Sequence, residues 1–221
     1  MKHRPDLLAL AATLPDLEML ARECLSHMAF EYIAGGAGDE VTLRANREAF
    51  DRIRLRLRAL VDVSAIDTST ELFGVRMPMP VLLAPCAYLR LAHPDGEVET
   101  VRGANASGVT LTASTAASTS VEEMAAAAAH PMWFQLYTSR DRAFTAGLVR
   151  RAEEAGCSAL CVTVDAPIRG IRDRDVRSNF ALPEGIGRPN LQGFTHAAAT
   201  ANPRPTGLSI YSANLDPTLT W

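Results

Sequence analysis

Four apolar runs, each ending in polar residues, constrain the fold of this chain more than any other feature of its sequence. The runs cover residues 80–85, 109–114, 132–137 and 159–165, so they recur at intervals of about 25 residues, counted from the start of one run to the start of the next. Continuous apolar runs of this length are typical of parallel strands that are covered on both faces. The intervals are long enough for a helix, so the sequence predicts repeated strand–helix units.

Polar side chains stand where each predicted strand ends. In a (β/α)8 barrel the residues at the carboxyl ends of the strands carry the chemistry. The four ends here hold Cys86 and Ala87, Ser114 and Thr115, Gln135 and Tyr137, and Thr163 and Asp165. We therefore expect an α/β chain of the (β/α)8 barrel class whose strand ends form one side of a site.

The length of the chain limits how much of such a barrel it can hold. A complete barrel needs about 250 residues, whereas this chain has 221 residues and uses nearly eighty of them before the first clear strand. We expect about four βα units, with residues 1–78 as a capping region and 79–221 as the first half of a barrel. The aperiodic stretch at about 183–207 is rich in Pro, Gly, Ala, Asn and Thr, which predicts a mobile loop or lid.

The amino-terminal region has its own pattern. Helical spacing predicts a helix from Asp16, as its cap, to about Ile33, ending at the glycine-rich residues 34–38, and a second helix over 40–50. The alternating residues 52–58 (RIRLRLR) suit an extended strand, or alternatively a solvated charged face. Residues 70–73 are expected to form another short strand.

Charge and composition exclude several classes of function. The formal net charge is −3, which argues against binding to nucleic acid or to a membrane through a basic surface. The four cysteines form no CxxC pair, and the five histidines show no spacing typical of metal ligands. We expect no metal, reduced thiols and a cytoplasmic location, and no apolar stretch is long enough to span a membrane.

Each strand-end residue also has a purely structural explanation. Gln135 and Thr163 could satisfy backbone groups, and Asp165 could cap a turn. Together, however, these neutral hydrogen-bonding groups would meet at one end of a parallel sheet. Such a lining suits a flat heteroaromatic cofactor with several ring donors and acceptors.

Several motifs in order give the chain a specific resemblance. They are residues 31–37 (EYIAGGA), 46–50 (NREAF), 84–85 (AP), 92–97 (AHPDGE), 135–137 (QLY), 163–167 (TVDAP) and 219–221 (LTW). From about Asp16 onward, the chain resembles the amino-terminal part of the FMN-dependent α-hydroxy-acid oxidase/dehydrogenase family. That family includes glycolate oxidase, lactate oxidase and enzymes that oxidise mandelate or hydroxymandelate. Another FMN barrel, a type 2 isopentenyl-diphosphate isomerase, fits these motifs poorly.

The resemblance implies roles for individual residues. FMN would be lined by the residues that follow the predicted strands: Pro85, Cys86, Ala87, Ser114, Gln135 and Thr163. Tyr32 and Arg172 match residues near the substrate carboxylate, and Tyr137 matches the tyrosine that hydrogen-bonds the substrate. Asp165 matches the carboxylate that supports the catalytic histidine. Ala116 stands where plant glycolate oxidases carry a bulky tryptophan, so the pocket is expected to accept a larger 2-substituent.

Two of these residues keep an open structural alternative. An arginine with a tyrosine hydroxyl is a sensible clamp for the carboxylate of a 2-hydroxy acid. Arg172, however, stands among Arg169, Arg174 and Arg177 and could be a surface arginine. Tyr32 could equally be an aromatic anchor at the end of its helix.

The resemblance implies FMN-dependent oxidation of a small (S)-2-hydroxy acid to the 2-oxo acid, with oxygen or another electron acceptor. None of the histidines stands at the strand end that would hold the proton acceptor: His3, His27, His93, His130 and His196. We therefore expect a truncated or split portion that is inactive alone. It would act as a homo-oligomer or with a complementary half. The alternative is a degenerate, non-catalytic paralogue that acts as a partner or binding module.

Overall fold

The computed structural model describes residues 11–165 and 170–193. Contacts divide the chain into two compact units. The first, called here the helical unit, is Met1–Arg52 with Gly170–Ala181, and the second, the sheet unit, is Ile53–Arg169 with Leu182–Trp221. The division expected from the sequence, between residues 78 and 79, falls at a different place and stays a prediction. Residues 194–207 of the expected mobile loop lie outside the described residues.

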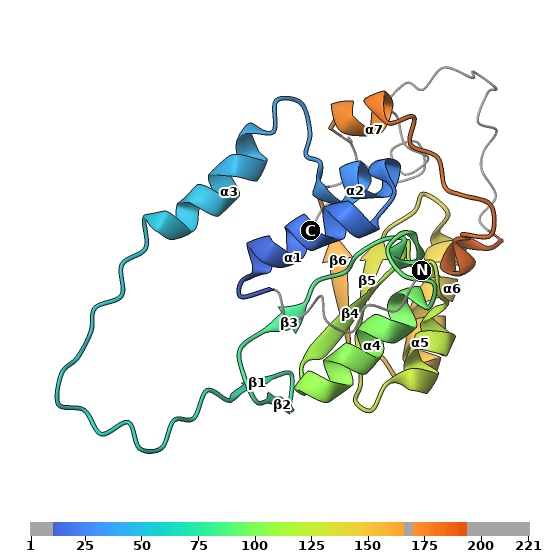
Figure 1. Cartoon of the computed structure of the whole chain (residues 1–221). Helices are drawn as coiled ribbons and strands as arrows, with labels where there is room; N and C mark the ends of the chain where they lie inside the picture. Colours follow the sequence, from blue (N-terminus) through green and yellow to red (C-terminus); the bar gives the residue numbers. More distant parts are fainter. Residues whose placement is uncertain (1–10, 166–169, 194–221) are drawn as a thin grey trace. The chain divides into compact units, whose positions relative to one another are not determined.

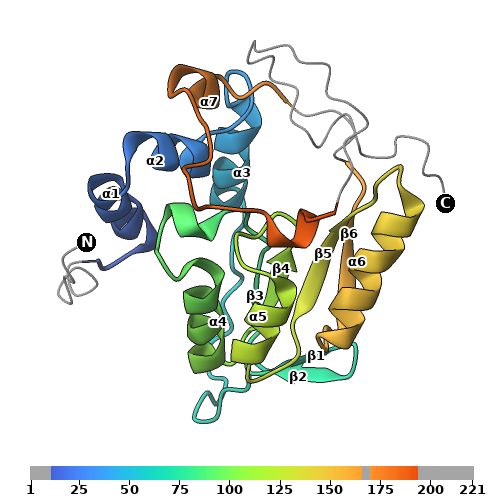
Figure 2. The same cartoon turned by 90° about the vertical axis from the view of Figure 1, so that its right-hand side faces the viewer.

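The sheet unit is built on four parallel strands in the order β3-β4-β5-β6 (Figures 1 and 2). The strands are β3 (Leu82–Leu83), β4 (Thr110–Ser114), β5 (Trp133–Tyr137) and β6 (Ala159–Thr163). The helices between them are α4 (Gly96–Ser107), α5 (Val121–Ala127) and α6 (Arg142–Glu154). Each strand pairs with the next one along the chain, as in a barrel. The four predicted strands and the helices between them are confirmed.

Alternation along the strands separates an apolar face from a polar one. Phe134 and Leu136 of β5 pack in one buried core with Leu148 of α6 and Met124 of α5. Figure 2 shows α4, α5 and α6 along one face of the sheet. Because neighbouring side chains on a strand point to opposite faces, Gln135 lies on the face away from these helices.

Local capping explains where these helices begin and end. Ser120 forms a capping box with Glu123 at the start of α5, and the Asp141 carboxylate accepts a hydrogen bond from the N–H of Phe144 at the start of α6. Helix α4 ends at Gly108, whose φ of 66° favours glycine. Asp141 is therefore the cap of α6, which begins at Arg142.

A short hairpin covers the amino-terminal end of the sheet. Strands β1 (Thr70–Leu72) and β2 (Val75–Met77) are antiparallel, and Phe73 and Gly74 between them both have positive φ, as a two-residue turn of this hand requires. The Phe73 ring lies 5.4 Å from the ring of Trp133, the first residue of β5. Met77 is buried, and its sulfur accepts a hydrogen bond from the Thr110 hydroxyl at the start of β4. The strand predicted near 70–73 is confirmed.

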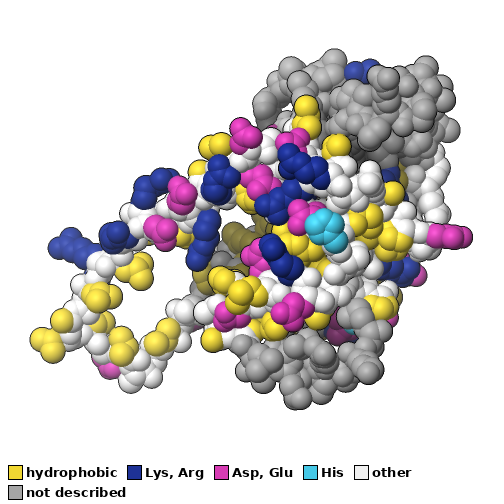
Figure 3. All heavy atoms as spheres, turned by 45° about the horizontal axis from the view of Figure 1, so that its top comes forward, with side chains coloured by type: hydrophobic (Ala, Val, Ile, Leu, Met, Phe, Trp, Pro, Cys, Tyr) yellow, Lys and Arg dark blue, Asp and Glu magenta, His cyan; other side chains and the backbone are white. Residues whose placement is uncertain are grey.

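The alternating segment 52–58 does not form the expected strand. It pairs with no strand among the described residues, and the side chains of Leu55 and Leu57 are 86% and 88% exposed. A period of two indicates an extended backbone, but a strand also needs a neighbour for its hydrogen bonds. Figure 3 shows apolar side chains projecting to solvent along the extended stretch that follows α3. The solvated alternative describes it better.

The helical unit contains α1 (Leu14–Cys24), α2 (His27–Ala34), α3 (Val41–Asp51) and α7 (Asp173–Arg177). The single helix expected from Asp16 to Ile33 is wrong, because Ser26 caps a new helix by accepting a hydrogen bond from the N–H of Ala29. Asp16 is also not the cap of α1. Thr13 is the cap, and Asp16 completes its capping box from the third helical position.

No helix among the residues that the structure describes is long and apolar enough to cross a membrane.

Candidate functional site

The carboxyl ends of β4, β5 and β6 bring three predicted site residues together. The side-chain amide of Gln135 donates to the hydroxyl of Thr163 at 2.8 Å, and the hydroxyl of Ser114 lies 3.4 Å from the Gln135 carbonyl oxygen. Ser114 and Gln135 are partners in the strand register, so their side chains leave the same face of the sheet. We call Ser114, Gln135 and Thr163 the strand-end cluster.

The strand-end cluster is neutral, and two of its three members are buried. Ser114 is 6% exposed and Gln135 is 3% exposed, whereas Thr163 is half-buried. The Gln135 carbonyl oxygen also accepts a hydrogen bond from the N–H of Thr115 at 3.2 Å. The Thr115 hydroxyl in turn donates to the backbone carbonyl of Gln135. The amide of Gln135 is therefore fixed in orientation and offers both donor and acceptor at the sheet edge.

Two further predicted residues lie at the same edge. Tyr137 ends β5, is half-buried and faces Thr163 in the strand register. Asp165 follows β6 by two residues and is exposed. The strand-end positions predicted for both residues are confirmed, while their chemical roles stay a prediction.

The loops after β3 and β4 complete this edge of the sheet. Pro85 and Cys86 are exposed and Ala87 is half-buried in the loop that follows β3. In the loop after β4, Ala116 is 3% exposed, and its N–H donates to the Ser114 hydroxyl at 3.1 Å. The backbone at Ala116 is therefore held by the strand-end cluster itself.

In the helical unit, the structure brings Tyr32 and Arg172 together in a structural arrangement. The guanidinium group of Arg172 donates to the backbone carbonyls of Tyr32 and Gly35, the latter at 2.9 Å, so it caps the carboxyl end of α2. Its central carbon lies 5.0 Å from the Tyr32 ring centroid, and Tyr32 stacks on Phe180 at 4.3 Å. The stacking on Phe180 agrees with the aromatic anchor named as the alternative for Tyr32. Arg172, with a side chain 21% exposed and bonded to two carbonyls, is not the free surface arginine named as its alternative.

Sequence reasoning missed two buried polar residues that support the edge of the sheet. Asn190, in the turn Pro189–Leu191, is fully buried, and its carbonyl oxygen accepts from the N–H of Val121 at the start of α5. Its amide donates to the carbonyl of Ser114 at 3.4 Å. Glu97 of α4 is the second such residue, 1% exposed. Residues 183–193 belong to the predicted mobile loop, and within them Asn190 is an anchored point.

The donors and acceptors at the strand ends fit a flat, polar cofactor such as a flavin ring. Each member of the cluster is neutral, and Gln135 offers an acceptor and a donor in one plane, as ring carbonyl and N–H groups require. Among the described residues, no group of His, Cys, Asp and Glu could hold a metal ion.

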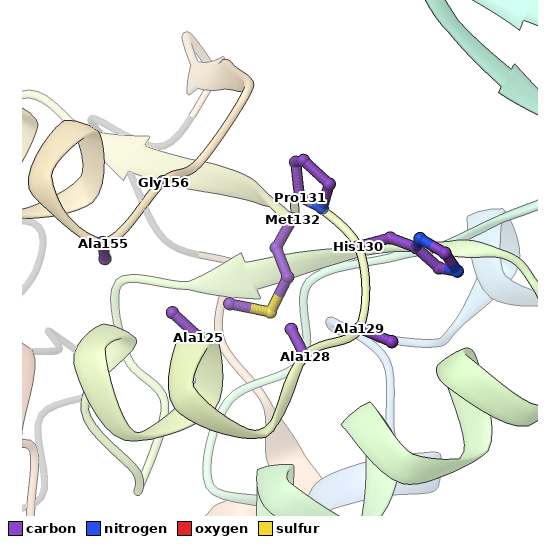
Figure 4. A pocket seen from close by; sticks show the side chains of 8 residues that line it. All are labelled: Ala125, Ala128, Ala129, His130, Pro131, Met132, Ala155 and Gly156. Atoms are coloured by element: carbon purple, nitrogen blue, oxygen red, sulfur yellow. The ribbon is translucent and has the colours of Figure 1, made fainter.

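A separate pocket lies at the opposite end of the strands. It has a volume of about 250 Å³ and is lined by residues before β5 and β6, among them His130, Met132 and Gly156. Figure 4 shows the Met132 side chain extending toward Ala125 and Ala128, while the His130 ring points away from them. This pocket is therefore distinct from the strand-end cluster.

Four successive parallel strands with helices on one face, and neutral polar groups at the strand ends, are the arrangement of part of a (β/α)8 barrel. Comparison with known protein families identifies the family. The chain belongs to the FMN-dependent dehydrogenase family, which matches residues 21–221.

Named relatives agree with this membership. The chain is 44% identical over 211 residues to an L-lactate oxidase of Nostoc sp., a match that covers 93% of this chain and 58% of the relative. It is 45% identical over 185 residues to a 4-hydroxymandelate oxidase of Amycolatopsis orientalis, covering 84% of this chain and 52% of the relative. The chain thus spans little more than half the length of the curated relatives that it matches.

The fold is confirmed by solved structures. A mandelate oxidase bound to 3,3-difluoro-2-hydroxy-3-phenylpropionic acid superposes with a TM-score of 0.79 at 45% identity, covering 81% of this chain and 54% of that one. The expected resemblance and the expected barrel class are both confirmed.

Proposed function

We propose that this chain supplies the flavin-facing part of an FMN-dependent oxidase or dehydrogenase that converts a small (S)-2-hydroxy acid to the 2-oxo acid. The hydrogen-bonded cluster of Ser114, Gln135 and Thr163 is the observation that carries the proposal. When bound, FMN would accept the hydride equivalent from the substrate and pass electrons to oxygen or another acceptor.

The cofactor would be held mainly by neutral groups. Gln135 would present its amide to the edge of the flavin ring, with Ser114 and Thr163 beside it. The backbone of Pro85, Cys86 and Ala87 would line the ring from the loop after β3. These groups can exchange their mutual hydrogen bonds for bonds to a ligand, so binding leaves none of them unpaired.

The substrate would be recognised by residues at the same edge. Tyr137 would donate its hydroxyl to the substrate, and Asp165 would orient the imidazole that takes the proton and increase its basicity. Ala116 is small and its backbone is fixed, so the pocket would admit a 2-substituent larger than that of glycolate. Some relatives are named for lactate, glycolate or 4-hydroxymandelate.

We also propose that Tyr32 and Arg172 recognise the substrate carboxylate. A guanidinium group has five N–H donors. The two α2 carbonyls are bonded only through Nη2, and Nε lies 3.3 Å from a carboxylate oxygen of Asp175, so Nη1 would meet the substrate in this proposal. Arg172 can therefore hold an anion while it continues to cap α2. In this proposal the cap fixes the arginine before the substrate arrives.

A proton acceptor is needed besides these residues. His27 lies in α2, His93 in a turn before α4 and His130 at the amino-terminal end of β5, so none of these three stands at a carboxyl strand end. We propose that these 221 residues alone turn over no hydroxy acid, and that a complementary polypeptide or oligomeric partner completes the site. With four free thiols, a cytoplasmic location is proposed.

Flavin titration of the purified chain tests the proposal. Flavin fluorescence should be quenched on binding, and Gln135→Leu should weaken the affinity by about tenfold, because the ring would lose a donor and an acceptor. Gln192→Leu is the matched control, since Gln192 is exposed. A folded chain that ignores FMN would contradict the proposal and favour the degenerate paralogue. Robust oxidation of lactate or mandelate by the pure chain would contradict its predicted inactivity.

A further inference from the structure

Glu97, the second residue of α4, is a buried carboxylate held by neutral groups. A glutamate is rarely buried completely unless its charge is paired or hydrogen-bonded. Four groups donate to it: the N–H of Leu89 at 3.1 Å, the N–H of Ser118 at 2.7 Å, the Ser118 hydroxyl at 2.8 Å and the Thr119 hydroxyl at 2.8 Å. Both oxygens of the carboxylate are therefore used.

The donors to Glu97 come from two separate loops. Leu89 begins the short helix η2 (Leu89–Leu91), which directly follows the loop after β3. Ser118 and Thr119 belong to the loop between β4 and α5. The Ser118 hydroxyl also accepts a hydrogen bond from the N–H of Arg90 at 3.1 Å. One carboxylate thus ties together the loops that follow two neighbouring strands.

The backbone before Glu97 leaves its side chain little freedom. Gly96 has a φ of 50°, and a Cβ atom there would lie 2.6 Å from Cγ of Arg90. The first turn of α4 is therefore packed directly on η2, as only glycine permits. This close approach fixes the direction in which Glu97 leaves α4.

We infer that Glu97 is a positioning residue of the proposed flavin site, an inference that depends on the proposed function. It holds the loop containing Cys86 and Ala87 in register with the loop that follows Ser114, and it does not itself touch the ligand. A site made of groups from several loops binds well only when each group is held close to its productive position.

The inference predicts a specific order of flavin affinities among variants. Glu97→Ala removes every acceptor and should raise the FMN dissociation constant by about tenfold or more. Glu97→Gln keeps an acceptor for the two N–H groups, and the hydroxyls can turn to accept from its amide, so the constant should rise by no more than about threefold. Glu99 of the same helix is exposed and paired with Arg102, so Glu99→Ala and Glu99→Gln are matched controls.

Two comparisons separate positioning from a general loss of stability. Val101→Ala removes buried apolar volume from the same helix and should lower the melting temperature without weakening flavin binding. Hydrogen exchange at the N–H groups of Leu89 and Ser118 should accelerate in Glu97→Ala but stay slow in Glu97→Gln. This second measurement needs no flavin, so it decides the role of Glu97 even if the unmodified chain does not bind FMN and the proposed function fails.

The inference is overturned if Glu97→Ala binds FMN as tightly as the unmodified chain. It is equally overturned if the affinities of Glu97→Ala and Val101→Ala fall in proportion to their melting temperatures. Should Glu97→Ala not fold, Thr119→Val removes one donor and leaves the carboxylate in place. That variant should raise the dissociation constant by about threefold, and an unchanged constant would contradict the inference.

Discussion

Different interactions stabilise the interior of the sheet unit and the interior of the helical unit. In the sheet unit, Phe134 and its neighbours form a continuous buried core beneath the polar strand ends. In the helical unit, α1 and α3 contain no buried residue, and α2 contains only Ala29 and Phe30. The first unit is stabilised mainly by apolar burial, while the second depends on individual polar contacts.

Those polar contacts in the helical unit gather around Arg174. Its guanidinium group lies 2.6 Å from a carboxylate oxygen of Glu40 and 3.5 Å from one of Glu31. Glu40 also accepts a hydrogen bond from the N–H of Gly36 at 3.0 Å. Partly exposed ion pairs weaken when salt is added and when acid protonates their carboxylates, whereas an apolar core responds little to either change. The two units should therefore fail under different conditions.

The largest expected effect comes from the core of the sheet unit. Phe134→Ala should destabilise the chain by about 3–5 kcal/mol, because the fully buried ring leaves a cavity. Urea unfolding followed by circular dichroism measures this change. The matched variant in the helical unit is Phe50→Ala, since Phe50 is 67% exposed, and it should change stability by less than about 0.5 kcal/mol. Equal effects of the two variants would refute the contrast.

Thiol chemistry provides the second test. Burial, with a smaller contribution from the negative charge of Glu122, raises the pKa of Cys157 to about 11 from 9.0. A raised pKa means less thiolate at every pH below it, so labelling at pH 8 should be about 100-fold slower in the folded than in the urea-unfolded chain. Cys24 in the helical unit is exposed and is the control, with labelling that changes little on unfolding. Fast labelling of folded Cys157 would show that this side of the sheet unit opens.

A third test removes the buried polar side chain of Asn190 from the sheet unit. Asn190→Ala leaves the buried N–H of Val121 without its acceptor, while the carbonyl of Ser114 keeps its hydrogen bond from the N–H of Ala117. A cost of about 1–3 kcal/mol is expected for the unpaired N–H group. Chemical unfolding measures the cost, and Gln192→Ala at an exposed neighbouring position is the control. A cost no larger than that of the control would show that Asn190 does not anchor this segment.

The smallest expected effect is a response of the helical unit to acid. The N–H of Gly36 and then Arg174 hold the pKa of Glu40 below its usual value of 4.5. A lowered pKa in the folded state stabilises the fold above about pH 4.5, and this contribution is lost as the pH falls through the lowered pKa. The protection of residues 170–181 against hydrogen exchange, relative to the intrinsic exchange rate at each pH, should therefore fall below pH 4.5.

In Glu40→Gln the same segment should already exchange faster at pH 6, whereas Glu48→Gln on the exposed surface of α3 should behave like the unmodified chain. If Glu40→Gln shows the same acid response as the unmodified chain, that response comes from groups other than Glu40.

The parts that the sequence predicted well depend on local patterns. The four strands follow from continuous apolar runs. The break between α1 and α2 was missed because apolar spacing continues across it. Ser26, which caps α2, was the available signal. The alternating residues 52–58 were misassigned because the pattern carries no information about a partner strand.

The residues at the strand ends could be predicted from the sequence, whereas the buried residues that support them could not. The strand-end cluster could be predicted because a parallel sheet aligns the ends of successive strands. Glu97 and Asn190 could not, because their partners in other loops, Ser118 and Ser114, lie 21 and 76 residues away in the chain. In a single sequence, a buried glutamate and a solvated one look alike.

The outer edge of β6 has a practical consequence for anyone who handles this protein. Among the described strands, β6 pairs with β5 alone, and its Leu160 and Val162 are 42% and 45% exposed. A strand with one free row of backbone groups and bare aliphatic side chains recruits other chains. Purified samples should therefore show particle sizes that grow with concentration, and a charged residue in place of Val162 should keep them small.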